Sequence, residues 1–426
     1  MLKKKFFIAL CSAVLISGSL FGQEETLRLS VKDAESYAVE HNRSMKTASL
    51  EVKKADYTRW QAISSMLPQV SGAFGHNNYL GYEMELMNMP IAMKPTTNFT
   101  LQAGLGVSGQ QIISTTISDV VKEMAQTNYE KSEQTIKSQV RKLYFSALAV
   151  ENTIALLEQN MENMLTLETL TQRSAEVGVS EQTDVDQISV QVSSLRNTIN
   201  STRRSLEMIY NSLRLMLGTS VSAELILSER FDDVFSVENV ESLLREQFSI
   251  TKNLDYQLTE QSVELAKKQV RINEWAYGPQ LSVAYQFTGK IQKTDFDMNP
   301  PQALVLTLNI PIFSSGTKLA KVNESKMDYQ AAVNNFETVS DQLQIQDRQL
   351  RFNLRSNLEN YETQRRNIDV SQRVFANISN KYEHGYSSSL DLTNASTNLI
   401  AAQSNYVQAM LELLNAQIEL EELLNK

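Results

Sequence analysis

The sequence predicts a mainly α-helical protein with a membrane β-barrel region, in which long coiled-coil hairpins and four β-strands are arranged as a tandem repeat. Two observations lead to this fold class. All seven prolines of the 426-residue chain and most of its glycines fall in two windows, residues 68–109 and 278–316. Outside these windows, apolar residues recur at alternating spacings of four and three, which is typical of long helices that pack together.

The composition argues against several classes of protein. With 21% charged and 42% hydrophobic residues, the chain is neither disordered nor a multi-span helical membrane protein. Three histidines and one cysteine argue against zinc and haem sites, cysteine nucleophiles and disulfide frameworks. A net charge of −9 argues against nucleic acid as a partner. We therefore expect no metal site and no cofactor.

The N-terminus reads as a secretory signal peptide over residues 1–22. Three lysines at positions 3–5 precede a short apolar run, Phe6 to Ile16, and small residues follow. Cleavage near Gly22 would leave Gln23 as the first residue, and the alternative is a buried N-terminal helix. Cys11 lies inside the apolar run, which argues against a lipidated cysteine. The mature protein is therefore expected beyond the inner membrane.

Two stretches without glycine or proline, residues 110–177 and 317–384, contain 68 residues each. A helix of that length extends about 100 Å and needs partners along its length. Each stretch is followed by a glycine, Gly178 or Gly385, and then by a second stretch with a regular apolar seam. We therefore predict two helical hairpins, about residues 110–217 and 317–425, with their tips at these glycines.

The two halves of the chain repeat the same landmarks. Each half reads as a helix, a strand window, a long helix, a glycine tip and a returning helix, which predicts a first repeat over residues 23–218 and a second over 219–426. The matching pairs are Asn42 with Asn253, Ala55 with Ala266, Pro68 with Pro279, Gly178 with Gly385, and Asp184 with Asp391.

The proline-containing windows predict strands, about residues 68–109 and 279–313, in which apolar residues alternate with small or polar ones. Such strands suit a barrel with lipid outside and water inside, although a soluble β-sandwich would alternate equally well. Residues 79–95 and 290–301 would then form external loops. Four strands cannot close a barrel, and open edges in lipid are costly, so several copies must share it. Two copies would supply eight strands, and three would supply twelve.

On these features the chain resembles the TolC-type outer-membrane efflux proteins over essentially its whole mature length. The resemblance is carried by the repeat, the strand entries Pro68-Gln69-Val70-Ser71 and Pro279-Gln280-Leu281-Ser282, the tip Val177-Gly178-Val179-Ser180, and the strand end Leu308-Asn309-Ile310-Pro311-Ile312-Phe313. It implies a homotrimer in the outer membrane of a Gram-negative bacterium, with one twelve-stranded barrel above a periplasmic α-barrel. It also implies a periplasmic adaptor (membrane fusion) protein, an inner-membrane pump of the RND or ABC type, and passive export through a gated tunnel.

The resemblance also assigns candidate site residues. The gate would involve Asp391, Asn394, Asp184 and Tyr382. Asn394 departs from the acidic residue of the family pattern, and Ser387 stands where the family member used for comparison has a latch arginine. Three copies of Asp391 would attract cations to the axis, although an aspartate is also favoured by the dipole in the first turn of a helix. A hydrogen bond from Tyr382 to Asp184 is expected.

The exposed tips would dock the adaptor. The residues in question are Gly178, Val179, Ser180, Gly385, Tyr386 and Ser387. An enzyme is not expected, because the sequence has no histidine pair, serine elbow or glycine-rich phosphate loop. A secreted or periplasmic coiled-coil scaffold or adhesin is the alternative, and it leaves the two strand windows unexplained. The sequence leaves the exported substrate open between drugs, metals and proteins.

Overall fold

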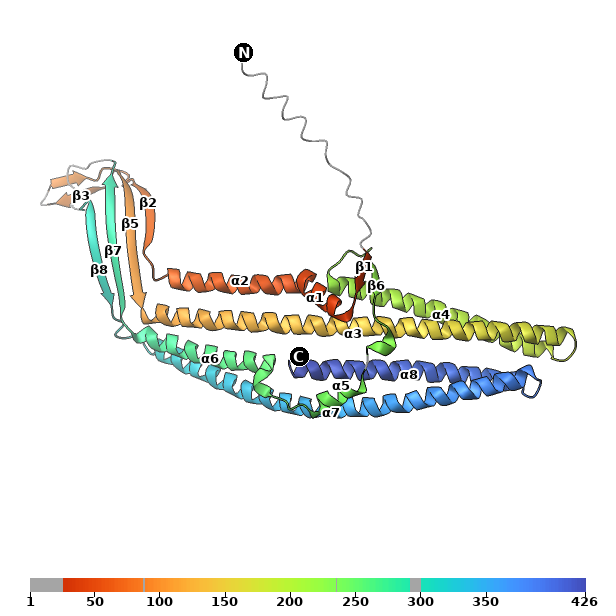
Figure 1. The fold of residues 1–426 in the computed structure, drawn as a ribbon. Coiled ribbons are helices and arrows are strands. Elements are labelled where there is room, and N and C mark those ends of the chain that lie inside the picture. The colour runs from red at the N-terminus through yellow and green to blue at the C-terminus, as the bar shows by residue number, and fades with distance from the viewer. Residues whose placement is uncertain (1–25, 87–88, 235, 292–299) are drawn as a thin grey trace, which may run out of the picture.

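The computed structural model describes residues 26–86, 89–234, 236–291 and 300–426. The predicted signal peptide and most of the second expected external loop therefore lie outside the described residues. The molecule is an elongated helical shaft (Figure 1). A β-sheet lies across one end, and two helical hairpins turn at the other end.

Four helices make up most of the shaft. The helix α3 (Gly109–Glu176) has 68 residues and returns through α4 (Gln182–Leu217). In the second half, α7 (Thr317–Glu383) has 67 residues and returns through α8 (Ser389–Leu423). The two members of each hairpin pack against each other, and α3 also contacts α8.

Shorter helices complete the part of the shaft next to the sheet and the middle of the shaft. The helices α2 (Arg43–Ser64) and α6 (Leu254–Glu274) each precede a strand of the large sheet. Around the middle lie α1 (Val31–His41), α5 (Val237–Arg245) and the 3₁₀ turns η1 (Phe231–Asp233) and η2 (Ile250–Lys252), while η3 (Trp275–Tyr277) follows α6. A parallel pair of strands, β1 (Thr26–Leu29) and β6 (Glu224–Leu227), ties the two halves together there.

The large sheet combines strands from both halves in the order β2-β5-β7-β8, all antiparallel. Its members are β2 (Gln69–Asn77), β5 (Thr96–Ser108), β7 (Gln280–Lys290) and β8 (Gln302–Asn309). Within the described part of the chain the sheet is open, and β2 and β8 are its edges. A single chain therefore forms no closed barrel. The first expected external loop contains a hairpin of β3 (Glu83–Leu86) and β4 (Met89–Ala92).

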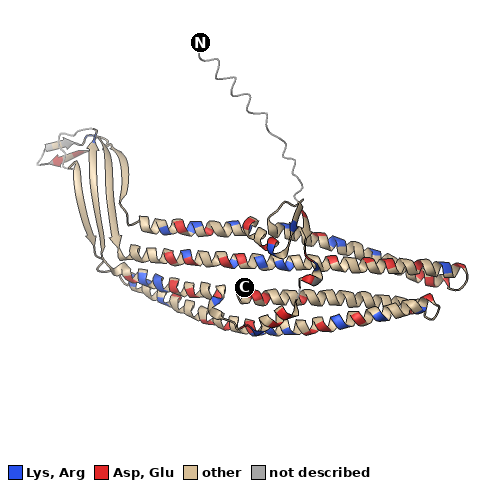
Figure 2. Ribbon diagram, viewed as in Figure 1, with Lys and Arg blue, Asp and Glu red and all other residues tan. Residues whose placement is uncertain are grey.

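The register of this sheet gives it two chemically different faces. Residues paired across antiparallel strands share a face. One such row joins Leu105 to Val283 and Val283 to Leu306, whereas the next row joins Gly106, Ser282 and Thr307. The alternation that the sequence shows along single strands thus holds across the sheet, with one face apolar and the other small or polar. Figure 2 shows that charged residues occur along the helices and are almost absent from these four strands.

The hydrophobic core lies in the shaft. The larger cluster, at mid-shaft, includes the fully buried Tyr144, Leu354 and Leu413, and a smaller cluster nearer the tips is built around Ile188 and Leu392. Among the described residues, no helix is long and apolar enough to cross a membrane.

Candidate functional site at the helical tips

Both hairpins turn at a glycine in the left-handed conformation. Gly178 has φ = 77° and Gly385 has φ = 74°. A Cβ atom at either position would meet nothing within 4 Å, so the backbone angle alone calls for glycine. The N–H of Gly178 donates to the carbonyl of Ala175, and that of Gly385 donates to the carbonyl of Tyr382. These bonds satisfy carbonyls at the ends of α3 and α7 and fix the direction of the turn.

The returning helix of each tip begins with a capping box, in which the third residue of the helix is an aspartate, Asp184 or Asp391. Ser388 donates to Asp391 Oδ2 from its hydroxyl at 2.7 Å and from its N–H at 3.1 Å. These hydrogen bonds, above all the one from the Ser388 side chain, lower the pKa of Asp391 below its usual value. The first turn of α8 therefore uses Asp391 as a cap and keeps its exposed carboxylate ionised.

Two polar contacts join the two tips within one chain. The Ser389 hydroxyl donates to the carboxylate of Asp184, which links α8 to α4. The hydroxyl of Tyr382 lies 2.6 Å from Oγ1 of Thr171, which links α7 to α3. Tyr382 and Asp184, between which a hydrogen bond is expected from the sequence, each bond a hydroxyl group of the opposite hairpin instead.

A cavity of about 460 Å³ lies between the tips, directly beside these contacts. Asp184, Tyr382 and Ser387 line it together with Ser389. Asn394 is exposed and is not one of its lining residues. The structure therefore brings Asp184, Tyr382 and Ser387 together around this cavity and joins Asp391 to them through the Ser387 hydroxyl, which donates to Asp391 Oδ2 at 3.3 Å. Asn394 lies apart.

The docking residues predicted from the sequence lie at the outer end of the shaft. Val179 is 79% exposed and Tyr386 is 83% exposed, so each glycine turn presents a large apolar side chain to solvent. Gly178 and Gly385 are exposed beside them, and Ser180 and Ser387 are half-buried.

Sequence reasoning missed the two hydroxyl partners, Thr171 and Ser389. Both are buried, with 1% and 6% of their surface exposed. Thr171 lies seven residues after the seam residue Met164, and Ser389 lies three residues before the seam residue Leu392. A hydroxyl residue at an otherwise apolar seam position is the signal that could have identified them.

In the described ranges no three His, Cys, Asp or Glu side chains are grouped so that they could hold a metal ion. A long helical shaft that carries an open antiparallel sheet with one apolar face suits an outer-membrane protein with a periplasmic helical body. The sequence pattern of the outer membrane efflux protein family matches residues 36–219 and 249–426, and the chain belongs to this family. Efflux is a transport function, which agrees with the expectation that the chain is not an enzyme.

Individual relatives show the same relationship. The chain is 24% identical over 336 residues to the probable efflux pump outer membrane protein TtgC of Pseudomonas putida, covering 75% of this chain and 67% of the relative. The crystal structure of CusC has the same fold, with a TM-score of 0.78 at 18% identity and 95% of each chain covered. The structure of VceC from Vibrio cholerae gives a TM-score of 0.75 at 15% identity, covering 93% of this chain and 96% of that one.

Proposed function

We propose that this protein is the exit duct of a tripartite efflux system or a type I secretion system. Three copies form one tunnel, which crosses the outer membrane as a twelve-stranded barrel and continues through the periplasm as a tube of helices. Substrates pass through it without chemistry, delivered by an inner-membrane pump of the RND or ABC type and a periplasmic adaptor. The named role of TtgC in an efflux pump supports this assignment.

The observation that carries the proposal is the two-faced open sheet. Its apolar face, which includes Leu105, Val283 and Leu306, suits lipid, and its small and polar face suits a water-filled lumen. Both edge strands, β2 and β8, have a side without a partner strand in the described chain. In lipid each unpaired backbone group costs several kcal/mol, so the edges call for strands from other copies.

The number of strands favours three copies over two. A barrel of about eight strands has an interior just wide enough to be filled by its own side chains. Two copies of this four-stranded sheet would therefore leave no open path. Three copies supply twelve strands and a wider lumen.

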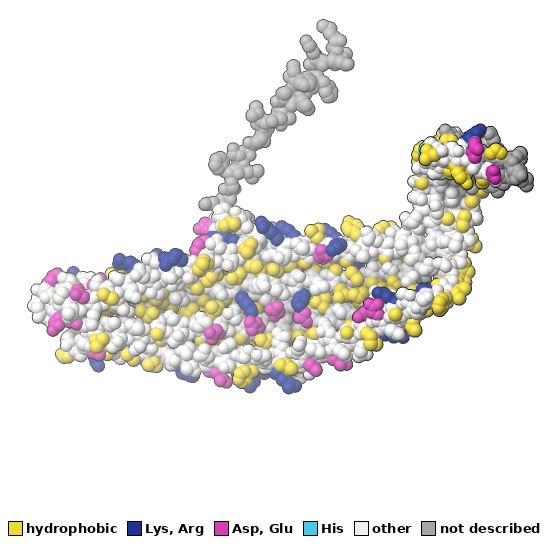
Figure 3. All heavy atoms as spheres, turned by 180° about the vertical axis from the view of Figure 1, so that it is seen from behind, with side chains coloured by type: hydrophobic (Ala, Val, Ile, Leu, Met, Phe, Trp, Pro, Cys, Tyr) yellow, Lys and Arg dark blue, Asp and Glu magenta, His cyan; other side chains and the backbone are white. Residues whose placement is uncertain are grey.

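The shaft supports the same arrangement. Because α3 and α7 have 68 and 67 residues, each extends about 100 Å away from the sheet. A band of hydrophobic side chains runs along the middle of the shaft on the face shown in Figure 3. An apolar band of this kind is a surface that neighbouring copies can cover.

The tips would form the gate. The contacts from Ser389 to Asp184 and from Tyr382 to Thr171 hold the two hairpins of one chain together at the point where the tube narrows. The latch of this protein would thus rely on hydroxyl groups instead of an arginine. The exposed Val179 and Tyr386 would contact the adaptor.

Two measurements on the detergent-purified mature protein test the proposal. Native mass spectrometry should give a complex of three chains, and planar bilayers should show discrete ionic conductance steps. A monomer that stays in solution without detergent and leaves bilayers silent would instead support the coiled-coil scaffold.

A further inference from the structure

Each half of the shaft contains one continuous rod and one jointed rod. The continuous rods are α3 and α7, which run from the sheet to the tip without a break. The jointed rods are made of helices that are distant in sequence: α4 is aligned with α2, and α8 is aligned with α6 (Figure 1). Since α2 leads into β2 and α6 leads into β7, each jointed rod also connects a tip to the sheet.

A buried asparagine forms the joint in the first half. Asn42 is the N-cap of α2, and its Oδ1 accepts from the N–H of Ser44 at 2.7 Å. Its Nδ2 donates to the carbonyl of Met216, in the last turn of α4, at 2.7 Å. A single amide therefore bonds the start of one helix and the end of another, which only a side chain with both an acceptor and a donor can do.

The matching residue of the second half has the same bonds. Asn253 is the N-cap of α6, and its Oδ1 accepts from the N–H of Asp255 at 2.9 Å. Its Nδ2 donates to the carbonyl of Leu423, the last residue of α8, at 3.1 Å. Both asparagines are buried, with 5% and 6% of their surface exposed. The asparagine pair that marks the sequence repeat thus has one physical role in both halves.

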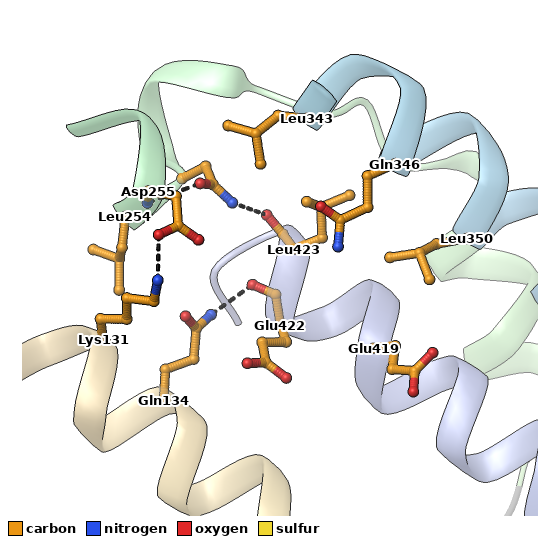
Figure 4. Close-up of a pocket in the computed structure, with 11 residues that line it drawn as sticks. Lys131, Gln134, Leu254, Asp255, Leu343, Gln346, Leu350, Glu419, Glu422 and Leu423 are labelled. Atoms are coloured by element: carbon orange, nitrogen blue, oxygen red, sulfur yellow. Dashed lines mark hydrogen bonds and ion pairs between the residues drawn. The ribbon is translucent and has the colours of Figure 1, made fainter. Parts of the chain in front are cut away.

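The two joints differ in how tightly they are packed. At the first, Gly218 follows α4, and a Cβ there would lie 2.5 Å from the carbonyl oxygen of His41. At the second, a cavity of about 210 Å³ lies beside Asn253 among α3, α6, α7 and α8. Figure 4 shows this cavity, with the ion pair of Lys131 and Asp255 on its wall. A helix end beside a cavity can shift with less steric resistance than one packed against backbone.

We propose that Asn42 and Asn253 are positioning residues of the gate: their amides couple the returning helix of each tip to the helix that enters the sheet. A tip that opens displaces the far end of α8, and Asn253 passes that displacement to α6. Because of the cavity beside it, Asn253 is the more compliant joint. This inference rests on the gated duct proposed above.

Substitutions of Asn253 can test its bond to Leu423 separately from its role as the N-cap of α6. Asn253→Ser and Asn253→Asp both keep an oxygen that caps α6, but serine is too short to reach Leu423 and aspartate has no N–H to donate. Asn253→Ala loses both functions. Asn239→Asp, at an exposed position on α5, controls for the added charge.

In single-channel recordings, Asn253→Ser and Asn253→Asp should each raise the open probability about fivefold, the factor that one lost hydrogen bond supplies. The corresponding changes at Asn42 should have a smaller effect, and Asn239→Asp should match the wild type. If the serine and aspartate variants gate like the wild type and only Asn253→Ala differs, the asparagine is a helix cap and the inference is wrong.

Hydrogen exchange distinguishes this failure from failure of the duct itself. Loosening the tip with Ser389→Ala should speed the exchange of the Asp255 and Tyr256 amides when Asn253 is present, and should not do so with Asn253→Ser. Conductance without this dependence would refute the joint and keep the duct. The dependence in a protein that never conducts would keep the joint and refute the duct.

Discussion

The helical shaft and the sheet of this protein bury their apolar residues in different ways. In the shaft, Tyr144, Leu354 and Leu413 are completely buried within one chain. In the sheet, Leu304 and Leu306 are 73% and 68% exposed, although they lie on its apolar face. One chain is thus sufficient to bury the apolar residues of the shaft core but not those of the sheet.

This difference indicates that the two regions are adapted to different surroundings. The shaft core is shielded from water by its own helices, so its stability comes from burial within the chain. The apolar face of the sheet remains exposed in a single chain and would be stabilised by an apolar environment, which in the proposed duct is lipid. Folding of the shaft and completion of the sheet should therefore respond to different substitutions.

The largest effect on the shaft is expected from a cavity in its core. Leu354→Ala removes a fully buried side chain from α7 and should lower the free energy of unfolding by about 2–5 kcal/mol. Thermal unfolding followed by circular dichroism measures this loss. Gln349→Ala, at an exposed position of the same helix, should leave the midpoint unchanged. Equal midpoints for the two variants would show that this cluster does not support the shaft.

The sheet should depend on which of its faces is changed. Leu306→Lys places a charge in the middle of the apolar face, which in lipid costs about 2–4 kcal/mol per chain. Thr307→Lys places the same charge one residue further along, on the polar face. We expect the first variant to lose membrane insertion while the helical shaft stays folded, and the second to insert. Membrane flotation after expression measures this, and similar insertion of both variants would contradict a lipid-facing side.

The sequence predicts those parts of the structure that are determined by residues close together in the chain. Gly178 and Gly385 interrupt long glycine-free stretches, and both have the positive φ of a turn. The pair β1–β6 was not predicted. A strand of four residues is too short to show a pattern of alternating apolar and polar residues, and paired residues such as Thr26 and Glu224 lie 198 positions apart in the sequence. The partners of Asp184 and Tyr382 were missed for the same reason, since packing between the two hairpins decides them.

The shaft should also lose stability in alkali. Burial raises the pKa of Tyr144 to about 12, and its hydroxyl donates to the carbonyl of Leu29. Because the neutral form is favoured in the folded state, this stabilisation is complete below pH 10 and is lost as the pH rises from about 10 to about 12. The loss amounts to about 3 kcal/mol. Urea unfolding between pH 9 and 12 measures it.

Tyr144→Phe should flatten this pH dependence without abolishing it. Burial, followed by the hydrogen bond to Glu151, also raises the pKa of Tyr210, so part of the slope remains. An unchanged slope in Tyr144→Phe would show that Tyr144 does not ionise during unfolding.

The smallest effect on stability, and a selective one on transport, is expected at the tips. Asp391→Asn removes an exposed charge from the first turn of α8 but keeps an oxygen that can accept from Ser388, so the thermal midpoint should fall only slightly. In the proposed trimer the three Asp391 carboxylates attract cations at the gate. Because the hydrogen bonds from Ser388 lower the pKa of Asp391, the carboxylates stay charged at neutral pH.

We therefore expect Asp391→Asn to weaken cation selectivity and divalent-cation block in single-channel recordings. Asp233→Asn in η1, which removes an equal charge far from the tips, should leave both unchanged. Identical traces for wild type and Asp391→Asn would exclude an acidic ring at the gate, and Asp391 would then act only as a helix cap. A change in the traces together with a nearly unchanged thermal midpoint would instead show that Asp391 serves transport more than stability, in contrast to Leu354 in the core of the shaft.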